Sequence, residues 1–261
     1  MAQMAGLRWH DWLLSVGQNG CFYSSANRPT TECPHSGAAL KARYTQLGTR
    51  RLFCGYEQCG CEGAVAEREA IAARERHEAE KAVAEKRRRG LVRAGVPERY
   101  LGLDHPMAGE LASAMGGGQW LYLWGDVGTR KTTCAAAVAT RLYDRGKSPL
   151  MVPMYRVLDE IQRSFHDGGD PLKRYAESSY LLIDDLGKRR PTGFVLDVVF
   201  QLIDQRYSSM RPTLVTTQYR PSDLVRRLAE QGDADTAKAI VSRLRHGAMV
   251  VEFDGPDGRL S

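Results

Sequence analysis

A glycine-rich loop that ends in a lysine and two threonines is the part of this sequence best suited to chemistry. It lies between an apolar stretch and a segment with helical apolar spacing, and it consists of Gly125, Asp126, Val127, Gly128, Thr129, Arg130, Lys131, Thr132 and Thr133. A loop in this context binds phosphates, because its backbone N–H groups and the N-terminus of the following helix point toward them. We therefore expect Lys131 to reach the β- and γ-phosphates of a nucleotide and Thr132 to bind Mg²⁺.

Arg130 departs from the phosphate-loop pattern, which has glycine directly before the lysine. An arginine crowds the loop if the backbone there needs angles that only glycine adopts easily. It is tolerated if the residue already has helical angles and its side chain points outward. The sequence leaves both possibilities open, and with them a loop that keeps the fold but has lost nucleotide binding.

Two adjacent carboxylates end an apolar stretch further along the chain. The stretch begins at Tyr180 and ends in Asp184 and Asp185. Phosphoryl transfer needs charge neutralisation and a positioned nucleophile, so we expect Asp184 to hold Mg²⁺ through water and Asp185 to polarise the attacking water. Paired acids at a strand end are also common as turn or cap residues, but a single site would account for both motifs.

Cysteines are concentrated near the start of the chain, where a reducing compartment favours metal binding over disulfides. Structural zinc is held by four Cys or His ligands. The predicted ligands are Cys33, Cys54, Cys59 and Cys61, and either His35 or Cys21 is an alternative for one of them. An iron–sulfur cluster and reduced, unliganded cysteines remain open alternatives.

The elements that must position the loop and the carboxylates are alternating strands and helices. Short apolar segments predict strands over 120–124, 150–153, 180–184, 213–217 and 249–253. Apolar residues at three- and four-residue spacing predict helices over 131–143, 155–165, 194–207 and 224–228. This alternation predicts an α/β fold, with a parallel sheet covered by helices on both faces.

A small domain and a linker are predicted before this sheet. Residues 1–62 mix aromatic, Gly, Ser, Pro and Cys residues without a sustained helical period, which indicates a loop-rich domain with a thin core. Residues 63–92 are rich in Ala, Glu, Arg and Lys, which indicates an exposed linker helix with a Glu85–Arg89 pair, ended by Gly90. Residues 93–261 then form the α/β domain.

Four segments in this order resemble the DnaC/IstB group of AAA+ ATPases: residues 94–100, the loop at 125–132, the acidic strand at 182–187, and residues 200–207. The resemblance covers about Arg93 to Arg259. It implies a P-loop AAA+ fold, ATP and Mg²⁺ as ligands, ATPase activity, and a replicative helicase as the partner of a helicase loader. An IstB-like transposition ATPase, or a non-hydrolysing adaptor in which Arg130 has disabled the loop, remains an alternative.

The resemblance also implies roles for three residues outside the two motifs. Gln218 follows the next strand, where the family has a polar residue that senses the γ-phosphate, and its amide could orient water. Arg243 is similar to the family's arginine finger, which acts on the nucleotide of a neighbouring copy and so implies a homo-oligomer. Arg259 falls near the family's second sensor arginine.

Charge and composition limit the other partners. The 37 Lys and Arg residues against 31 Asp and Glu give a formal charge of +6. This charge permits an anionic partner such as single-stranded DNA, with Lys188-Arg189-Arg190 as a candidate contact. No apolar run reaches the roughly 18–20 residues that span a bilayer, and the N-terminus lacks the pattern of a signal peptide. We therefore expect a cytoplasmic protein with no membrane partner.

Overall fold

The computed structural model describes residues 31–48, 50–230 and 233–255 of the chain. These residues belong to two compact units, and the boundary between the units lies between Ala82 and Val83, inside a long helix. The first unit carries the cysteine-rich segment, and the second carries the glycine-rich loop.

Two short antiparallel strand pairs precede the long helix in the first unit. They are β1 (Thr31–Glu32) with β2 (Ala39–Leu40), and β3 (Ala42–Leu47) with β4 (Arg50–Tyr56). The ring of Phe53 meets those of Tyr44 and Tyr56 edge to face, with centroids 5.8 and 5.2 Å apart. The structure contains more strand than the loop-rich prediction. β1 and β2 have only two residues each, and β3 and β4 mix Arg, Gln and Gly with their apolar residues, so they leave little apolar pattern in the sequence.

A single long helix, α2, runs from Glu62 to Arg93 and contains the predicted linker helix. Its Ala, Glu, Lys and Arg residues explain it, because all four types favour helical backbone. Glu85 pairs with Arg88 at 3.1 Å and, as predicted, with Arg89 at 2.8 Å. Although α2 is long, it is highly charged, and no helix among the described residues is apolar enough over a sufficient length to cross a membrane.

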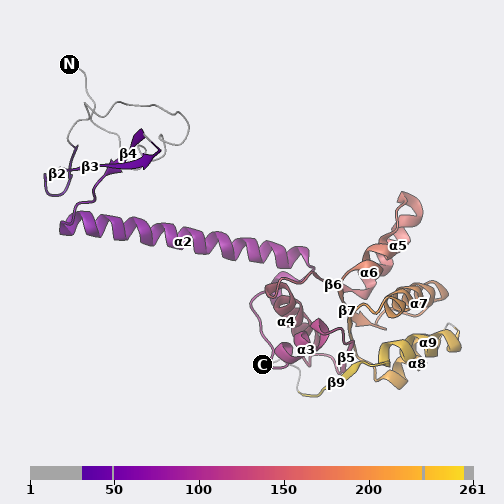
Figure 1. The fold of residues 1–261 in the computed structure, drawn as a ribbon. Coiled ribbons are helices and arrows are strands. Elements are labelled where there is room, and N and C mark those ends of the chain that lie inside the picture. The colour runs from indigo at the N-terminus through magenta and orange to yellow at the C-terminus, as the bar shows by residue number, and fades with distance from the viewer. Residues whose placement is uncertain (1–30, 49, 231–232, 256–261) are drawn as a thin grey trace. The chain divides into compact units, whose positions relative to one another are not determined.

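Five parallel strands form the sheet of the second unit, which confirms the predicted α/β class (Figure 1). They are β5 (Leu121–Gly125), β6 (Pro149–Pro153), β7 (Tyr180–Leu186), β8 (Thr213–Thr217) and β9 (Met249–Phe253), in the order β6-β7-β8-β5-β9. β5 is hydrogen-bonded in parallel to both β8 and β9. The carboxyl ends of parallel strands lie at one edge of a sheet, which is where open α/β sheets bind ligands.

Helices cover both faces of this sheet (Figure 1). One face carries α3 (Ala108–Gly116) and α4 (Lys131–Asp144), and the other carries α5 (Met154–Asp167), α6 (Pro171–Glu177), α7 (Gly193–Ser208), α8 (Pro221–Ala229) and α9 (Ala234–Arg245). Successive residues of β7 alternate between the two cores. Leu182 packs under α3 and α4, whereas Leu181 and Ile183 pack on the opposite side. This period of two buries the strand on both faces.

Three helices, α3, α6 and α9, are missing from the sequence-based prediction. α3 is built mainly from Ala and Gly, which give weak apolar contrast. α6 has only 7 residues and begins after Asp170, whose side chain accepts a hydrogen bond from the Lys173 N–H. α9 begins in the same way after Asp233. Such caps mark the start of a helix even where apolar spacing does not.

The end of α2 packs closely within the second unit. Arg87 pairs with Asp144 through two hydrogen bonds of 2.7 and 2.8 Å, and Leu91 is buried. The predicted role of Gly90 is wrong, because the helix continues past it to Arg93. A side chain at Gly90 would collide with the hydroxyl group of Tyr143 on α4, so the glycine permits close helix packing instead.

The residues after α2 cover one edge of the sheet. The Met151 N–H on β6 donates a hydrogen bond of 2.7 Å to the Ala94 carbonyl. Gly95 follows with a φ of 85°, and the Met151 carbonyl leaves no room for a side chain there. The segment 94–95 therefore occupies hydrogen-bonding positions that an edge strand would otherwise leave open.

Arg206 on α7 is fully buried and acts as a cross-link between elements. Its guanidinium group donates to the carbonyls of Tyr175, Ser178 and Pro212 at 2.9, 2.8 and 2.6 Å, and to the Thr213 hydroxyl at 2.8 Å. These acceptors lie at the end of α6 and at the start of β8. Burial lowers the pKa of Arg206 to about 9, which still leaves the group protonated at neutral pH.

We expect Arg206→Met to lower the free energy of unfolding by at least about 3 kcal/mol, because several buried carbonyls would lose their donors together. Urea unfolding followed by circular dichroism measures this change. Arg226→Met is the matched control, since the Arg226 side chain is 81% exposed and pairs only at the surface with Asp223. It should cost less than about 1 kcal/mol. Equal stability of the two variants would contradict the cross-link.

Candidate functional site

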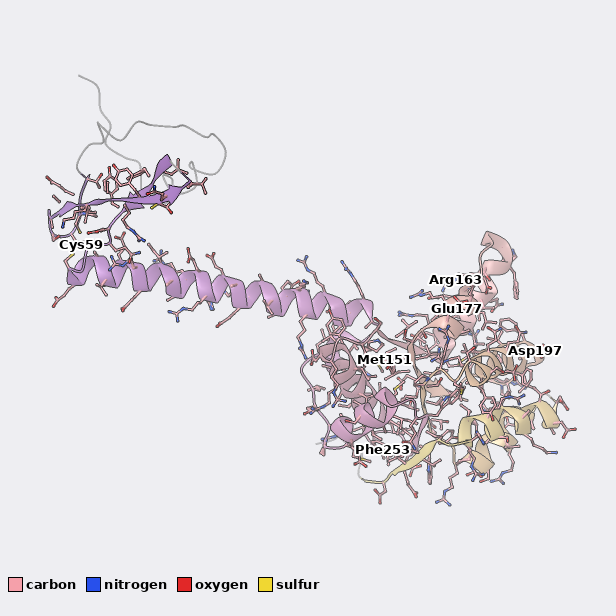
Figure 2. The ribbon with its side chains drawn as sticks, viewed as in Figure 1. Cys59, Met151, Arg163, Glu177, Asp197 and Phe253 are labelled. Carbon is pink, nitrogen blue, oxygen red and sulfur yellow. The ribbon has the colours of Figure 1, made fainter. Side chains whose placement is uncertain are left out.

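The glycine-rich loop connects the carboxyl end of β5 to the first turn of α4. Gly125 has a φ of 147°, and a side chain there would collide with the Phe253 carbonyl on β9, which Figure 2 labels. Gly128 has a φ of 87° and also needs the freedom of glycine. The loop thus has its glycines where the turn and the neighbouring strand require them. Its open N–H groups lie at the edge where ligands bind.

Lys131 lies at the centre of the loop and is only 7% exposed. Its ammonium group donates to the Gly125 and Asp126 carbonyls at 2.8 and 2.6 Å and to the Thr129 hydroxyl at 3.1 Å. A buried charge needs such partners, because desolvation would otherwise be costly. The loop therefore holds the lysine amine where a bound phosphate could exchange with these oxygens.

Thr132 and Asp184 meet between the loop and β7. The Thr132 hydroxyl lies 3.0 and 3.2 Å from the two carboxylate oxygens of Asp184. Asp184 is 8% exposed, and burial raises the pKa of its carboxyl group above the ordinary value. A hydroxyl and a carboxylate at this distance are oxygen ligands of the kind that Mg²⁺ uses in phosphate sites.

Thr216 on β8 is a site residue that sequence reasoning missed. Its hydroxyl donates to Asp184 Oδ1 at 2.5 Å and accepts from the Asp185 N–H at 3.0 Å. One buried side chain thus fixes both acidic residues. The available sequence signal was the polar Thr216 inside a strand that is otherwise buried, because a buried hydroxyl needs a partner.

Asp185 and Gln218 lie on the same cleft. Asp185 has a φ of 59°, which is unusual for a residue with a side chain, and its carboxylate pairs with Lys188 at 2.8 Å. Gln218 follows the last residue of β8. A carboxylate and an amide beside the phosphate loop are suited to orienting water.

The cleft has a volume of about 680 Å³, within the range of small-ligand sites. Its walls include Val127, Gly128, Arg130, Lys131, Thr132, Thr133, Asp184, Asp185 and Gln218, and so unite most of the predicted nucleotide-site residues. Arg99 and Tyr100, in the short helix η2 (Glu98–Tyr100), form another wall. The Arg99 guanidinium lies over the Tyr100 ring, 4.5 Å from its centroid. Sequence reasoning gave these two residues no role, although they fall in one of the resembling segments.

Arg130 adopts a left-handed backbone conformation, with φ 66° and ψ 18°. Of the two possibilities open in the sequence, the backbone thus takes the one that favours glycine, at a cost of about 1–2 kcal/mol for another residue. The side chain is exposed on the cleft. Burial, together with the charge of Arg130, lowers the pKa of His105, so the guanidinium also influences that side of the loop.

Arg243 does not line the cleft of its own chain. It lies on α9, where its guanidinium pairs with Asp204 at 2.8 Å and lies over the Phe200 ring at 5.2 Å. Both partners belong to α7. Arg259, the other arginine implied by resemblance, lies outside the described residues.

Three of the four predicted zinc ligands come together in the first unit. The sulfur atoms of Cys33, Cys59 and Cys61 lie within 4.8 Å of one another, near the start of α2 (Figure 2). The Cys33 and Cys61 sulfurs are 3.7 Å apart, close to the roughly 3.8 Å expected between two thiolates on one tetrahedral zinc. Cys54 is exposed on β4 and is not part of this group, and Cys21 lies outside the described residues.

The surroundings of Cys33 favour its thiolate form, whereas the pKa of Cys61 is raised. A hydrogen bond from the Ser36 hydroxyl, with further hydrogen bonds from nearby backbone, lowers the pKa of Cys33 to about 6. Thiolate is the form that binds metals. His35 stands beside the cluster in sequence, and its Nε2 contacts Glu67 at 2.9 Å. A carboxylate on one ring nitrogen is the usual way to orient a histidine whose other nitrogen binds a metal.

Comparison with known proteins gives one family match and several relatives. The model of the IstB-like ATP binding protein family matches residues 102–261. The chain is 27% identical over 151 residues to the replicative helicase loader DnaI of Bacillus subtilis, covering 55% of this chain and 49% of that protein. It is 28% identical over 111 residues to the replicative helicase loader DnaC of Escherichia coli, covering 41% of this chain and 45% of that protein. A putative ATP-binding protein in an insertion sequence of Mycobacterium tuberculosis is 24% identical to this chain over 144 residues, covering 54% of this chain and 56% of that protein.

The match thus spans about half the length of these relatives.

Solved structures support the same fold. The crystal structure of DnaI aligns with a TM-score of 0.54 and 24% identity, covering 60% of this chain and 94% of that chain. The crystal structure of the DnaC helicase loader aligns with a TM-score of 0.52 and 20% identity, covering 60% of this chain and 100% of that chain. These alignments confirm the predicted P-loop AAA+ fold of the second unit.

We expect Thr216→Val to weaken Mg²⁺-dependent nucleotide binding about fivefold to tenfold, because Asp184 would lose the donor that orients it. Isothermal titration with ATP, with and without Mg²⁺, measures the effect. Thr217→Val is the matched control: Thr217 is equally buried, but its hydroxyl donates to the Leu186 carbonyl at 2.7 Å. Both variants should lose about 1 kcal/mol of stability. Equal nucleotide binding by the two would show that Thr216 has no special role.

We expect Cys59→Ser to lower the metal content of the purified protein and Cys54→Ser to leave it unchanged, because only Cys59 belongs to the sulfur cluster. Inductively coupled plasma mass spectrometry measures zinc and iron together, so it also separates zinc from an iron–sulfur cluster. Metal loss from Cys54→Ser, with retention in Cys59→Ser, would overturn this ligand assignment.

Proposed function

The chain belongs to the family of IstB-like ATP binding proteins, and on that premise we propose that it is an ATPase that helps to load a replicative helicase onto single-stranded DNA. The observation that carries the ATPase part is the contact between Thr132 and Asp184 beside the buried Lys131. Loop, strand and lysine then form one site for ATP. The helicase comes from the relatives, two of which are helicase loaders.

Five side chains of the cleft, Lys131, Thr132, Asp184, Asp185 and Gln218, have a step in this proposal. Lys131 exchanges its loop carbonyls for the β- and γ-phosphates. Thr132 and Asp184 would hold Mg²⁺, which would supply charge neutralisation for the transferred phosphate. Asp185 accepts a proton from the attacking water, and the Gln218 amide orients that water. Asp185 pairs with Lys188, so its carboxylate must leave this partner before it can accept the proton.

The base of the nucleotide lies against Arg99 and Tyr100 in this proposal. Their stacked side chains form the part of the cleft that carries an aromatic ring. A purine can stack on either the ring or the guanidinium plane. These residues follow the end of α2 closely in sequence, so the same short segment joins the nucleotide site to the linker helix.

Arg243 acts on a neighbouring copy of the chain if it is an arginine finger. It is held by Asp204 and does not line its own cleft, which is compatible with action in trans. Such a finger places a guanidinium on the γ-phosphate of the neighbour. The proposal therefore includes a homo-oligomer.

Single-stranded DNA contacts the exposed basic segment Lys188-Arg189-Arg190, which begins two residues after the end of β7. Arg189 pairs with Asp159 on α5, so this segment is already linked to the neighbouring helix. The formal charge of +6 agrees with an anionic partner. Binding through such contacts weakens with added salt.

The cysteine unit, held by zinc through Cys33, Cys59, Cys61 and a fourth ligand, binds the helicase in this proposal. His35 is our choice as that fourth ligand, because Glu67 contacts its Nε2; its ring nitrogens lie outside the sulfur group, so the ring has to turn toward the sulfurs to bind. The protein then acts in the cytoplasm, with ATP controlling the second unit.

We expect the wild-type protein to bind and hydrolyse ATP, and Lys131→Ala to bind ATP at least about tenfold more weakly. Asp185→Asn should retain binding but hydrolyse at least about 100-fold more slowly, because the general base is gone. Titration calorimetry and phosphate release measure the two effects. The second part of the test is ATP-dependent co-purification with the replicative helicase of the same organism. Co-purification with a transposase instead would favour the transposition ATPase, and binding without turnover would favour the adaptor.

A further inference from the structure

Within the described residues, four cationic side chains line the cleft: Arg99, Arg130, Lys131 and Lys188. Arg99 donates to the Tyr100 hydroxyl, Lys131 to loop oxygens, and Lys188 to Asp185. The Arg130 backbone carbonyl accepts a hydrogen bond from the Cys134 N–H, but its side chain makes no hydrogen bond and no ion pair with any described residue. Its guanidinium is therefore the cation of the cleft that is available to an anionic ligand without breaking an existing contact.

The position of Arg130 also favours an anion. It is the residue directly before the first turn of α4, where open N–H groups give a helix its positive end. Lys131 follows it, so two cations and a helix N-terminus converge on one place. Glycine adopts the left-handed backbone of Arg130 most easily, and strain of this kind clusters at functional sites.

We propose that Arg130 binds the phosphate chain of the nucleotide in its own copy of the chain, as a second cation beside Lys131. The ligand is a nucleoside diphosphate or triphosphate, and the inference rests on the nucleotide-binding function proposed above. A guanidinium group presents several donors in a fixed plane and can bind two phosphate oxygens at once. The arginine that interrupts the glycine pattern then strengthens the site instead of disabling it.

The competing interpretation, in which Arg130 is a defect, makes the opposite prediction for Arg130→Gly. Glycine removes the backbone strain and restores the usual loop pattern, so a defect would be repaired and nucleotide would bind more tightly. If Arg130 binds phosphate, the same change removes a charge-assisted contact, and nucleotide binds more weakly in spite of the relieved strain.

The test is titration calorimetry of the full chain with Mg-ATP, Mg-ADP and adenosine, on wild type, Arg130→Gly and Arg130→Lys. Arg130→Gly should weaken ATP and ADP binding about tenfold or more and leave adenosine binding unchanged. Arg130→Lys keeps the charge and should lose less than Arg130→Gly. The salt dependence of ATP binding should also be shallower in Arg130→Gly, because one ionic contact is missing.

Met210→Gly is the control for strain relief. Met210 also has a left-handed backbone, with φ 49°, but it is 84% exposed and does not line the cleft, so its replacement should leave ATP affinity unchanged. Equal or tighter ATP binding by Arg130→Gly would overturn the inference while leaving the proposed function in place. Binding by Arg130→Gly alone, with none by wild type, would show a defective loop. No binding by either would remove both proposals.

Discussion

The carboxylate of Asp184 holds the functional part of this chain together. It accepts hydrogen bonds from Thr132, at the start of α4, and from Thr216, within β8, while it belongs itself to β7. Three elements that are distant in sequence therefore meet at one buried charge. Without its two hydroxyl donors this charge would be costly to bury. The strand order has to place β8 between β7 and β5 for these contacts to form. Fold and site thus depend on the same few hydrogen bonds.

Strain in the described part of the chain is concentrated at the cleft. Arg130, Asp185 and Met210 are the described residues other than glycine with a positive φ, and the first two face the same cavity. Asp185 is held in its conformation by the Thr216 hydroxyl, which accepts from its N–H, and by the pairing with Lys188. Surrounding contacts of this kind are what allow an unfavourable backbone to persist. The packed sheet stabilises the unit enough to offset the cost of the strained residues in the loops at its edge.

The sequence predicts most of the second unit, because its five strands and its helices α4, α5, α7 and α8 carry clear apolar patterns. The strands over 213–217 and 249–253 have the predicted bounds, since each is rich in apolar and β-branched residues. The loop and Asp184 could be found because their spacing and context are local. Thr216 left only a weak signal, a hydroxyl inside a buried strand, and Arg99 and Tyr100 stood out only as part of a resembling segment. Their roles depend on which elements become neighbours in the fold. Cys54 lies on β4 and is not part of the sulfur group of Cys33, Cys59 and Cys61. Its closeness in sequence to Cys59 does not tell toward which side a strand residue faces.

The hydrogen bond between Ala94 and Met151 has a consequence for solubility. β6 is an outer strand, and outer strands expose N–H and C=O groups that can pair with another molecule. The segment that follows α2 occupies one of these positions and, through Gly95, lies too close for a foreign strand to enter. A shortened protein that began just after Gly95 would keep every residue that lines the nucleotide cleft but lose this cover. We therefore expect such a fragment to associate through β6 more readily than one that includes residues 94–95.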